Sequence, residues 1–113
     1  MKSKNTLENG SVRHIIFKQD GVWYGVALEF NIVEEGDNPV EVMVSLFEAI
    51  QGYVQTAQKC KMSAAPLNQT PDKEYQKLWE KLSKSQVAGN KNEKSLQVYN
   101  FGYTPFASYA LCH

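Results

Sequence analysis

The sequence predicts an α+β fold, in which one long helix covers a three-stranded antiparallel meander (β-β-β-α) and a short second helix and one or two C-terminal strands follow. Two observations support this prediction. Three runs rich in β-branched and aromatic residues lie between residues 12 and 36, with Asp-Gly after the first and Gly after the third, as is typical of hairpin-linked strands. An apolar stripe at three- and four-residue spacing follows over residues 39–58, as is typical of an amphipathic helix.

The first two strands are predicted at residues 12–17 and 22–30, and a third at residues 32–35. Asp-Gly between the first two favours a type I′ hairpin, because both central residues of that turn need positive φ. Along the second strand the bulkier apolar side chains alternate onto one face, which we expect to lie under the long helix: Val22, Tyr24, Val26, Leu28 and Phe30. Trp23 then lies on the opposite face, beside small residues, and is expected to be open to contact with another chain.

The long helix is predicted from about Pro39 to Gln58. Asn38 is a favoured N-cap residue, proline suits the first helical position, and Glu41 follows three residues after the cap. The apolar stripe of this helix consists of Val42, Met43, Leu46, Phe47, Ile50, Tyr53, Val54 and Ala57. Its burial on the sheet should stabilise the domain by several kcal/mol, since a fully buried large apolar side chain contributes about 1.5–3 kcal/mol.

The C-terminal part of the chain carries shorter signals. A Thr-Pro-Asp start signal indicates a short amphipathic helix over Asp72 to Leu82. β character returns in Leu96 to Phe101 and again in Phe106 to Leu111. The polar residues 1–10 are expected to form a flexible leader, so that residues 11–113 form a single domain.

Composition favours a soluble, cytoplasmic protein. Of the 113 residues, 42% are hydrophobic, which is close to ordinary globular usage, and no apolar run approaches the ~20 residues that span a bilayer. The N-terminal residues lack the apolar stretch of a secretory signal. Cys60 and Cys112 are too few for a disulfide scaffold and lack the spacing of metal ligands. We therefore expect no membrane association, no metal and no cofactor.

Charge is balanced overall but divided along the chain. Residues 1–58 carry four basic and eight acidic residues, whereas residues 59–113 carry eight lysines and four acidic residues. The net charge of zero argues against a chain dedicated to nucleic-acid backbone, because that affinity comes from neutralising phosphates. It leaves open an RNA-binding module that uses exposed aromatic rings and the C-terminal lysines Lys77, Lys81 and Lys84.

The residues do not predict an enzyme. His14 is expected on the surface of a strand, Cys60 has no histidine nearby in sequence, and no phosphate-binding glycine loop or nucleophile elbow is present. Glu34 and Glu35 are consecutive on a predicted strand, so their side chains point to opposite faces and cannot share one metal ion. A remnant magnesium-dependent nuclease that uses Glu29 is the remaining catalytic alternative.

One group of residues resembles the HicB-like antitoxin family over roughly Arg13 to Val54. The matching residues are Asp20-Gly21, Trp23, Ala27-Leu28-Glu29, Gly36-Asp37-Asn38-Pro39, Glu41, Leu46 and Glu48-Ala49-Ile50. Asn38 stands where the family usually has Thr, and Val42 where it usually has Ala. Nothing from Lys59 to His113 resembles the helix-turn-helix or ribbon-helix-helix with which many members bind DNA, so we expect no DNA-binding domain.

The resemblance implies a small β-β-β-α-β domain, similar to part of a ribonuclease H fold, that forms homo-oligomers (a dimer or tetramer). It also implies binding and neutralisation of a HicA-like toxin, a small RNA-cleaving protein. We therefore expect a non-catalytic protein-binding domain whose candidate partner contacts are Trp23, Glu29, Glu34 and Glu35. The alternatives are the RNA-binding module and a stand-alone oligomeric HicB-like protein without a toxin.

Overall fold

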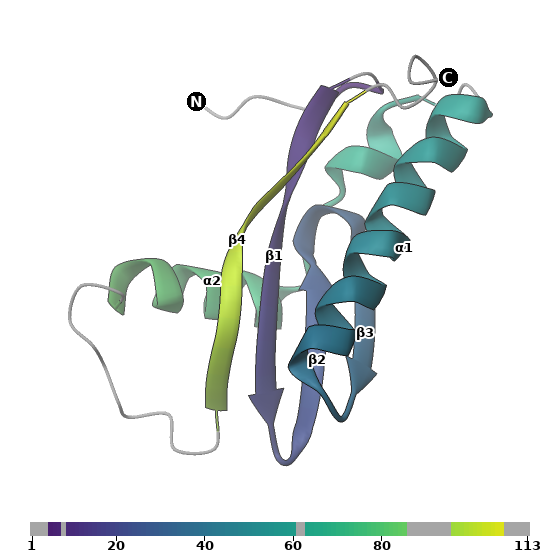
Figure 1. Cartoon of the computed structure of the whole chain (residues 1–113). Coiled ribbons are helices and arrows are strands. Elements are labelled where there is room, and N and C mark those ends of the chain that lie inside the picture. Colours follow the sequence, from purple (N-terminus) through teal and green to yellow (C-terminus); the bar gives the residue numbers. More distant parts are fainter. Residues whose placement is uncertain (1–4, 8, 61–62, 86–95, 108–113) are drawn as a thin grey trace.

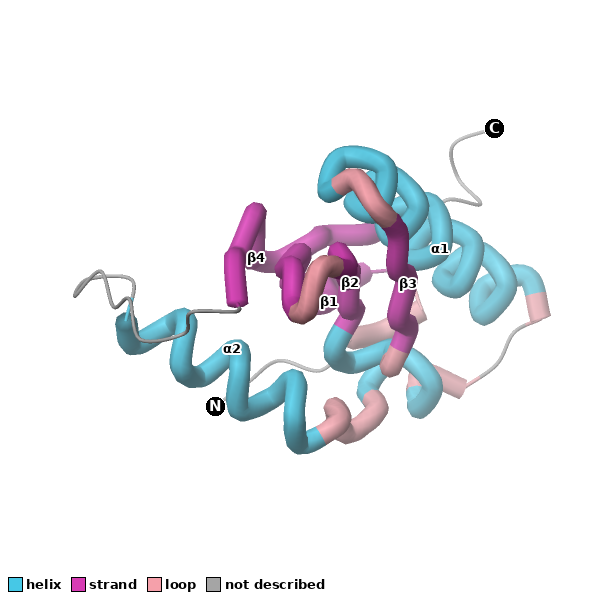
Figure 2. Tube along the Cα trace, turned by 90° about the horizontal axis from the view of Figure 1, so that it is seen from below, coloured by secondary structure: helices cyan, strands magenta, loops and turns pink. Residues whose placement is uncertain are grey.

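The computed structural model describes residues 5–7, 9–60, 63–85 and 96–107. The elements in chain order are β1 (Asn9–Gln19), β2 (Val22–Ala27), the 3-10 helix η1 (Leu28–Phe30), β3 (Ile32–Gly36), α1 (Pro39–Lys59), the 3-10 helix η2 (Ala65–Asn68), α2 (Lys73–Ser85) and β4 (Leu96–Ala107). The four strands form one antiparallel sheet in the order β3-β2-β1-β4. α1 runs along the strands on one face, and α2 lies across them on the other (Figures 1 and 2). The predicted α+β class is confirmed.

A tight hairpin joins β1 to β2, as the Asp-Gly step predicts. Asp20 and Gly21 have φ values of 53° and 86°, which is the positive-φ pair that a type I′ turn requires. β2 ends at Ala27, earlier than expected, because Leu28–Phe30 form a 3-10 helix that closes at Asn31 with φ of 54°. The side-chain alternation expected through residue 30 therefore stops at residue 27.

Helix α1 begins as its sequence predicts. The Asn38 Oδ1 atom accepts hydrogen bonds from the backbone N–H groups of Val40 at 2.8 Å and Glu41 at 3.2 Å, which satisfies two of the otherwise unpaired donors at the helix start. The buried residues of the helix are Val42, Leu46, Ile50, Val54 and Ala57. This stripe packs against the sheet and forms the first of two hydrophobic cores.

The face of β2 that α1 covers is opposite to the expected one. Trp23 packs against the α1 core, and a Cβ atom added to Gly25 would lie 2.9 Å from the Val42 Cγ1 atom. Tyr24 and Val26 belong instead to the core on the other face. The expectation was wrong because it assumed one covered face and chose the bulkier one. Close approach of a helix to a sheet needs small side chains beneath it, and here a second helix covers the bulkier face.

Helix α2 closes that second face. The buried residues of the second core are Ile15, Phe17, Val26, Leu28 and Trp79. Tyr75, Leu78 and Leu82 of α2 are half-buried against the same core, in agreement with the predicted amphipathic pattern. Within the described part of the chain, neither helix combines the length and apolar character needed to cross a membrane.

β4 is one continuous strand, within the one or two C-terminal strands that the sequence predicted. It pairs with β1 along its whole length, with a register shift opposite Ile16/Phe17. Gly102 and Pro105, which were expected to separate two strands, lie within it. Proline is tolerated here because β4 is an edge strand. The residues predicted as strand after Ala107 lie outside the described residues.

Part of the expected leader is packed. Asn5 is buried, and its Nδ2 atom donates to the carbonyl oxygen of Leu67 at 2.7 Å. Its Oδ1 atom accepts from the backbone N–H of Ser11 at 2.9 Å, and β1 begins at Asn9. The segment around Asn5 therefore joins β1 to η2, while residues 1–4 and 8 lie outside the described residues.

Candidate functional site

Glu29, a candidate partner contact, is held within the fold by Arg13. The Arg13 Nε–H donates to Glu29 Oε2 at 2.6 Å, and the Arg13 backbone N–H donates to Glu29 Oε1 at 2.9 Å. The same guanidinium donates to Gln76 Oε1 at 2.9 Å and lies 5.3 Å from the centroid of the Trp79 ring. Arg13 is buried, so these contacts connect β1, η1 and α2. The carboxylate of Glu29 is therefore engaged inside the molecule.

Trp23, another candidate contact, is half-buried on the α1 side of the sheet. Its ring meets the Tyr99 ring edge-on, with centroids 6.2 Å apart, and the Lys18 Nζ atom lies 5.8 Å from its centroid. The expected sheet face with an open Trp23 is therefore not formed, because α1 covers this face. The exposed aromatic residue in this position is Tyr99, whose exposed fraction is 47%.

Glu34 and Glu35 lie on β3, at one edge of the sheet. The pairing of β3 with β2 places their side chains on opposite faces, as strand alternation predicts. Glu35 is exposed and Glu34 is half-buried. Asp37 and Glu41, both exposed, follow directly at the start of α1. We call Glu34, Glu35, Asp37 and Glu41 the acidic edge.

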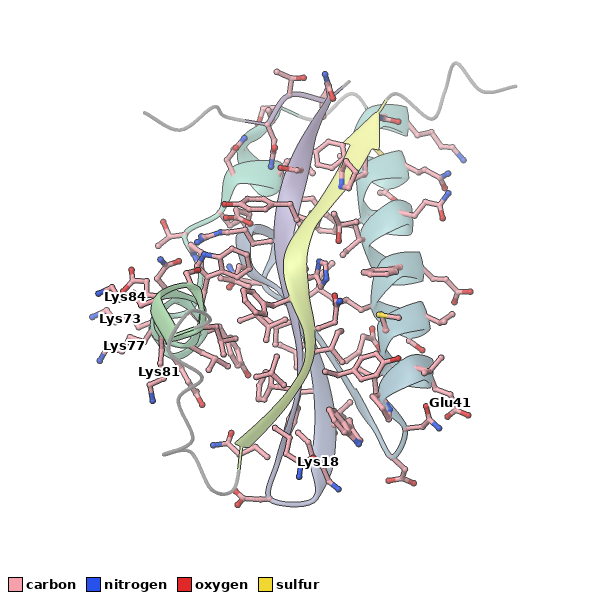
Figure 3. All side chains as sticks on the ribbon, turned by 60° about the vertical axis from the view of Figure 1, so that its left-hand side comes forward. Lys18, Glu41, Lys73, Lys77, Lys81 and Lys84 are labelled. Atoms are coloured by element: carbon pink, nitrogen blue, oxygen red, sulfur yellow. The ribbon has the colours of Figure 1, made fainter. Side chains whose placement is uncertain are left out.

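Helix α2 carries the opposite charge on its outer side. Its four exposed lysines, Lys73, Lys77, Lys81 and Lys84, point away from the sheet on the side of the molecule remote from Glu41 (Figure 3). We call these four residues the lysine stripe. Like charges four residues apart weaken a helix by roughly 0.2–0.5 kcal/mol per pair. The acidic edge and the lysine stripe are thus separated in space.

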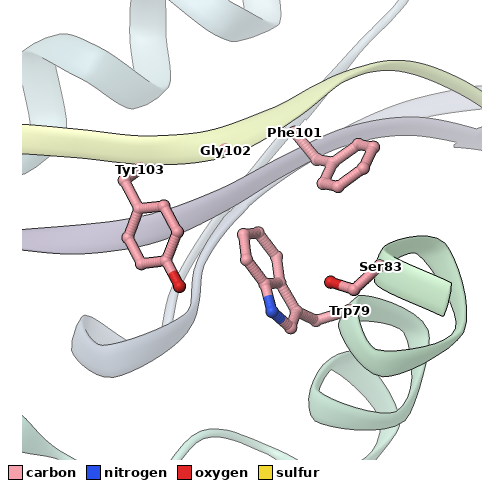
Figure 4. Close-up of a pocket in the computed structure, with 5 residues that line it drawn as sticks. All are labelled: Trp79, Ser83, Phe101, Gly102 and Tyr103. Carbon is pink, nitrogen blue, oxygen red and sulfur yellow. The ribbon is translucent and has the colours of Figure 1, made fainter. Parts of the chain in front are cut away.

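An aromatic cleft opens between α2 and β4 (Figure 4). It has a volume of about 560 Å³ and is lined by Trp79, Ser83, Phe101, Gly102 and Tyr103. The Trp79 ring meets Phe101 and Tyr103 edge-on, at centroid distances of 5.6 and 5.4 Å. Trp79 is buried, whereas Tyr103 is 65% exposed. The cleft therefore has a packed floor and an exposed aromatic rim.

β4 forms the other edge of the sheet, and part of its backbone faces outward. The Arg13 N–H is directed at Glu29 and so points away from β4. Pairs in an antiparallel ladder alternate between hydrogen-bonded and non-hydrogen-bonded, so Tyr103, which lies opposite Arg13, directs its N–H and C=O to the open side. By the same alternation the backbone groups of Phe101 and Pro105 are also directed outward. Proline has no N–H, so at Pro105 only a C=O group is left on the open side.

His14, expected on a strand surface, is buried between the sheet and α1. Its Nε2 atom lies 2.6 Å from Asn100 Oδ1, its Nδ1 atom lies 2.8 Å from Thr104 Oγ1, and its ring meets Phe47 edge-on at 5.3 Å. Burial lowers the pKa of His14, and the hydrogen bond with Asn100 acts in the opposite direction. The expectation was wrong because the covering helix and both polar partners are distant in sequence. His14 joins β4 to β1.

The other titratable groups provide no candidate metal site in the part of the chain that the structure describes. Among those residues, no group of three or more His, Cys, Asp or Glu side chains could hold a metal ion. Cys60 is exposed and is not in a disulfide. Burial raises the pKa of Tyr75, and the charges of Glu74 and Asp72 act in the same direction.

The surface residues that sequence reasoning missed lie on β4. Val98, Tyr99 and Tyr103 are exposed along this edge strand. The available signal was the absence of any charged residue from Leu96 to Ala107, which is unusual for an exposed edge. Comparisons of the chain with models of known families, with curated proteins and with solved structures find no match.

Proposed function

We propose that this chain is a non-catalytic protein-binding domain of the HicB type, which binds and neutralises a small, basic, RNA-cleaving toxin. The observation that carries the proposal is the acidic edge. Three of its four side chains are exposed, and it lies within the segment from Arg13 to Val54 that resembles the family. Because the lysine stripe is on a remote side of the molecule (Figure 3), a basic partner would approach negative charge without meeting the lysine stripe.

Charge complementarity of this kind acts mainly on association rate and specificity. Binding should weaken as salt rises, since exposed charges are screened over about 8 Å at physiological ionic strength. Glu34 and Glu35 stay candidate contacts, and Asp37 and Glu41 join them. Glu29 is no longer a candidate, because Arg13 already occupies both of its oxygens.

The test is co-expression with the product of an adjacent gene that encodes a short, basic, histidine-bearing protein. If the proposal holds, this chain restores the growth that the neighbouring protein arrests, and the two proteins co-purify. The double variant Glu35→Lys/Asp37→Lys should lose rescue, whereas Glu74→Lys, which reverses an exposed carboxylate on α2, should keep it. Equal rescue by both variants, or no rescue by the natural chain, would contradict the proposal.

A second candidate function is RNA binding at α2. The observation in its favour is that α2 presents the lysine stripe to solvent and also lines the aromatic cleft. Lysines neutralise phosphates, and aromatic rings stack on unpaired bases. Labelled single-stranded RNA should then bind with an affinity that falls as salt rises.

The triple variant Lys77→Glu/Lys81→Glu/Lys84→Glu separates the two functions. It should abolish RNA binding and leave toxin rescue unchanged, while Glu35→Lys/Asp37→Lys should do the reverse. RNA binding that survives the triple variant would exclude the lysine stripe as its site. A chain that binds neither RNA nor a toxin would fit the third alternative, a stand-alone oligomer.

A further inference from the structure

We infer that the β4 edge binds a second copy of this chain, so that two four-stranded sheets join through their β4 strands into one continuous antiparallel sheet. The two copies are related by a two-fold axis perpendicular to the sheet. This inference does not depend on the proposed function, because the acidic edge lies at β3, on the opposite edge of the sheet.

The backbone of β4 supplies the first support. The N–H and C=O groups of Phe101 and Tyr103 are directed to the open side, as the Arg13–Glu29 hydrogen bond and the ladder register require. No other described strand pairs with this side of β4, and outward groups of this kind on an edge strand are a template for another strand. A two-fold axis perpendicular to the sheet brings two copies of one strand together in antiparallel orientation, so their outward groups can pair.

The side chains of the two edge strands supply the second support. Natural sheets protect an open edge with charged residues, and β3 follows this rule with Glu34 and Glu35. β4 has twelve residues and no charge. Of the features that protect a sheet edge, it has Pro105 near one end and the register shift opposite Ile16/Phe17 near the other. Within the described part of the chain, residues 100–104 therefore form an edge without a charge, a proline or a register shift, which is expected of a strand that is covered in the functional state.

Exposed apolar side chains on both faces of the sheet supply the third support. Val98 and Tyr103 flank the β4 edge on the α2 face, and Tyr99 flanks it on the α1 face. Val40 and Val44 of α1 are each 48% exposed. They lie seven and three residues before Phe47, and therefore on the same side of the helix.

That side of α1 is the one nearest β4. Phe47 contacts His14, which in turn bonds to Asn100 and Thr104 of β4. A second sheet joined at β4 would therefore bring a second α1 towards Val40 and Val44. The apolar surface on both sides of the strand would be covered in one step.

A second copy fits this edge better than a different protein does. In a two-fold interface each side chain near the axis meets its own equivalent, so a charged edge would repel itself. β4 carries no charge to repel, and the chain as a whole has a net charge of zero. The same arrangement at β3 would bring Glu34 and Glu35 close to their own copies. The absence of charge on β4 also provides no means of selecting a basic or acidic partner.

Hydrogen exchange of single backbone amides, followed by NMR, tests the inference directly. In a monomer the Phe101 and Tyr103 amides face water and exchange rapidly, whereas the Gly102 amide faces His14 of β1 and exchanges slowly. In the dimer all three should exchange slowly, and dilution should restore rapid exchange at Phe101 and Tyr103 only. Rapid exchange of these two amides in a sample that sedimentation shows to be dimeric would overturn the inference.

A matched pair of variants provides the second test. Val98 on β4 and Val33 on β3 are 36% and 46% exposed, and both lie on the α2 face of an edge strand. Val98→Lys should raise the dimer dissociation constant at least about 100-fold, because it places a lysine charge in the apolar surface that the second copy covers. Val33→Lys should leave the dissociation constant unchanged. Sedimentation equilibrium measures both.

Two results would overturn the inference in this assay: a natural chain that stays monomeric at all concentrations, and a dimer that Val33→Lys disrupts and Val98→Lys does not. Circular dichroism establishes that each variant is folded. If Val98→Lys does not fold, Tyr103→Lys replaces it, because 65% of that side chain is exposed and its loss removes little internal packing.

Discussion

Replacing Glu29 by Gln removes the negative charge that faces Arg13 and keeps the size of the side chain. Arg13 would stay buried, with a 7% exposed side chain, but without a counter-charge. The amide oxygen of Gln can accept from only one of the two donors that now reach Glu29, which are the Arg13 backbone N–H at 2.9 Å and the Arg13 Nε–H at 2.6 Å. The other donor loses its charged acceptor.

The magnitude follows from how deeply this ion pair is buried. Breaking a fully buried pair costs about 3–5 kcal/mol, whereas exposed pairs contribute about 0–1 kcal/mol. The side chain of Glu29 is 20% exposed, so we expect Glu29→Gln to lower the free energy of unfolding by about 2–3 kcal/mol. Urea denaturation should show a lower midpoint with an unchanged slope.

Glu35→Gln is the matched control, since it neutralises an exposed carboxylate on β3. It should change the free energy of unfolding by less than about 0.5 kcal/mol. A Glu29→Gln variant as stable as this control would refute the structural role of Glu29 and restore it as a candidate partner contact.

Three further predictions concern stability. Gly25→Ala should lower the free energy of unfolding by about 1–3 kcal/mol, because the added Cβ atom would lie 2.9 Å from Val42 Cγ1. Gly52→Ala is the control: an added Cβ atom there meets nothing within 4 Å, and alanine favours the helix, so this variant should raise the free energy of unfolding by about 0.5–1 kcal/mol. Equal effects of the two variants in thermal melts would contradict the close packing of Gly25 under α1. Asn38→Ala should cost about 1 kcal/mol through loss of two cap hydrogen bonds, and an unchanged urea midpoint would contradict the cap. The pKa of His14 is lowered in the folded state, so the unfolded chain binds a proton at this residue more readily than the folded chain does. The contribution of neutral His14 to stability should therefore be lost as the pH falls from about 7 through about 6.5 towards the lower folded-state pKa. The stability difference between the natural chain and His14→Gln should therefore shrink on acidification, and a difference that grew would show that the sign is wrong.

The elements whose signals are local were predictable from the sequence. The hairpin depends on two adjacent residues, Asp20 and Gly21, that adopt positive φ. The start of α1 depends on Asn38 and its near neighbours, and its buried stripe follows the helical period. Each of these elements needs information from within about twenty residues, and a pattern in the chain can supply that.

The covered faces and the inner polar contacts were not predictable in this way. The orientation of β2 depends on α2 as well as α1, because the bulkier side chains lie under the second helix. Glu29 is 16 residues from Arg13 in sequence, and nothing near either residue indicates their pairing. His14 finds its partners on β4, 90 residues away at Thr104. The set of candidate contacts changed for the same reason. Glu29 is bonded to Arg13 of β1, and Trp23 packs against the α1 core and Tyr99 of β4.

The pairing of β1 with β4 has a consequence for biosynthesis. Asn100, which bonds to His14, lies 86 positions later in the chain. The β4 side of β1 therefore has no strand partner until β4 has left the ribosome. The hairpin, β3 and α1 can assemble earlier, since their contacts span short loops, while closing the large loop to β4 is entropically costly and slow. The nascent chain therefore exposes this side of β1 until residues 96–107 emerge, and the four-stranded sheet is completed only then.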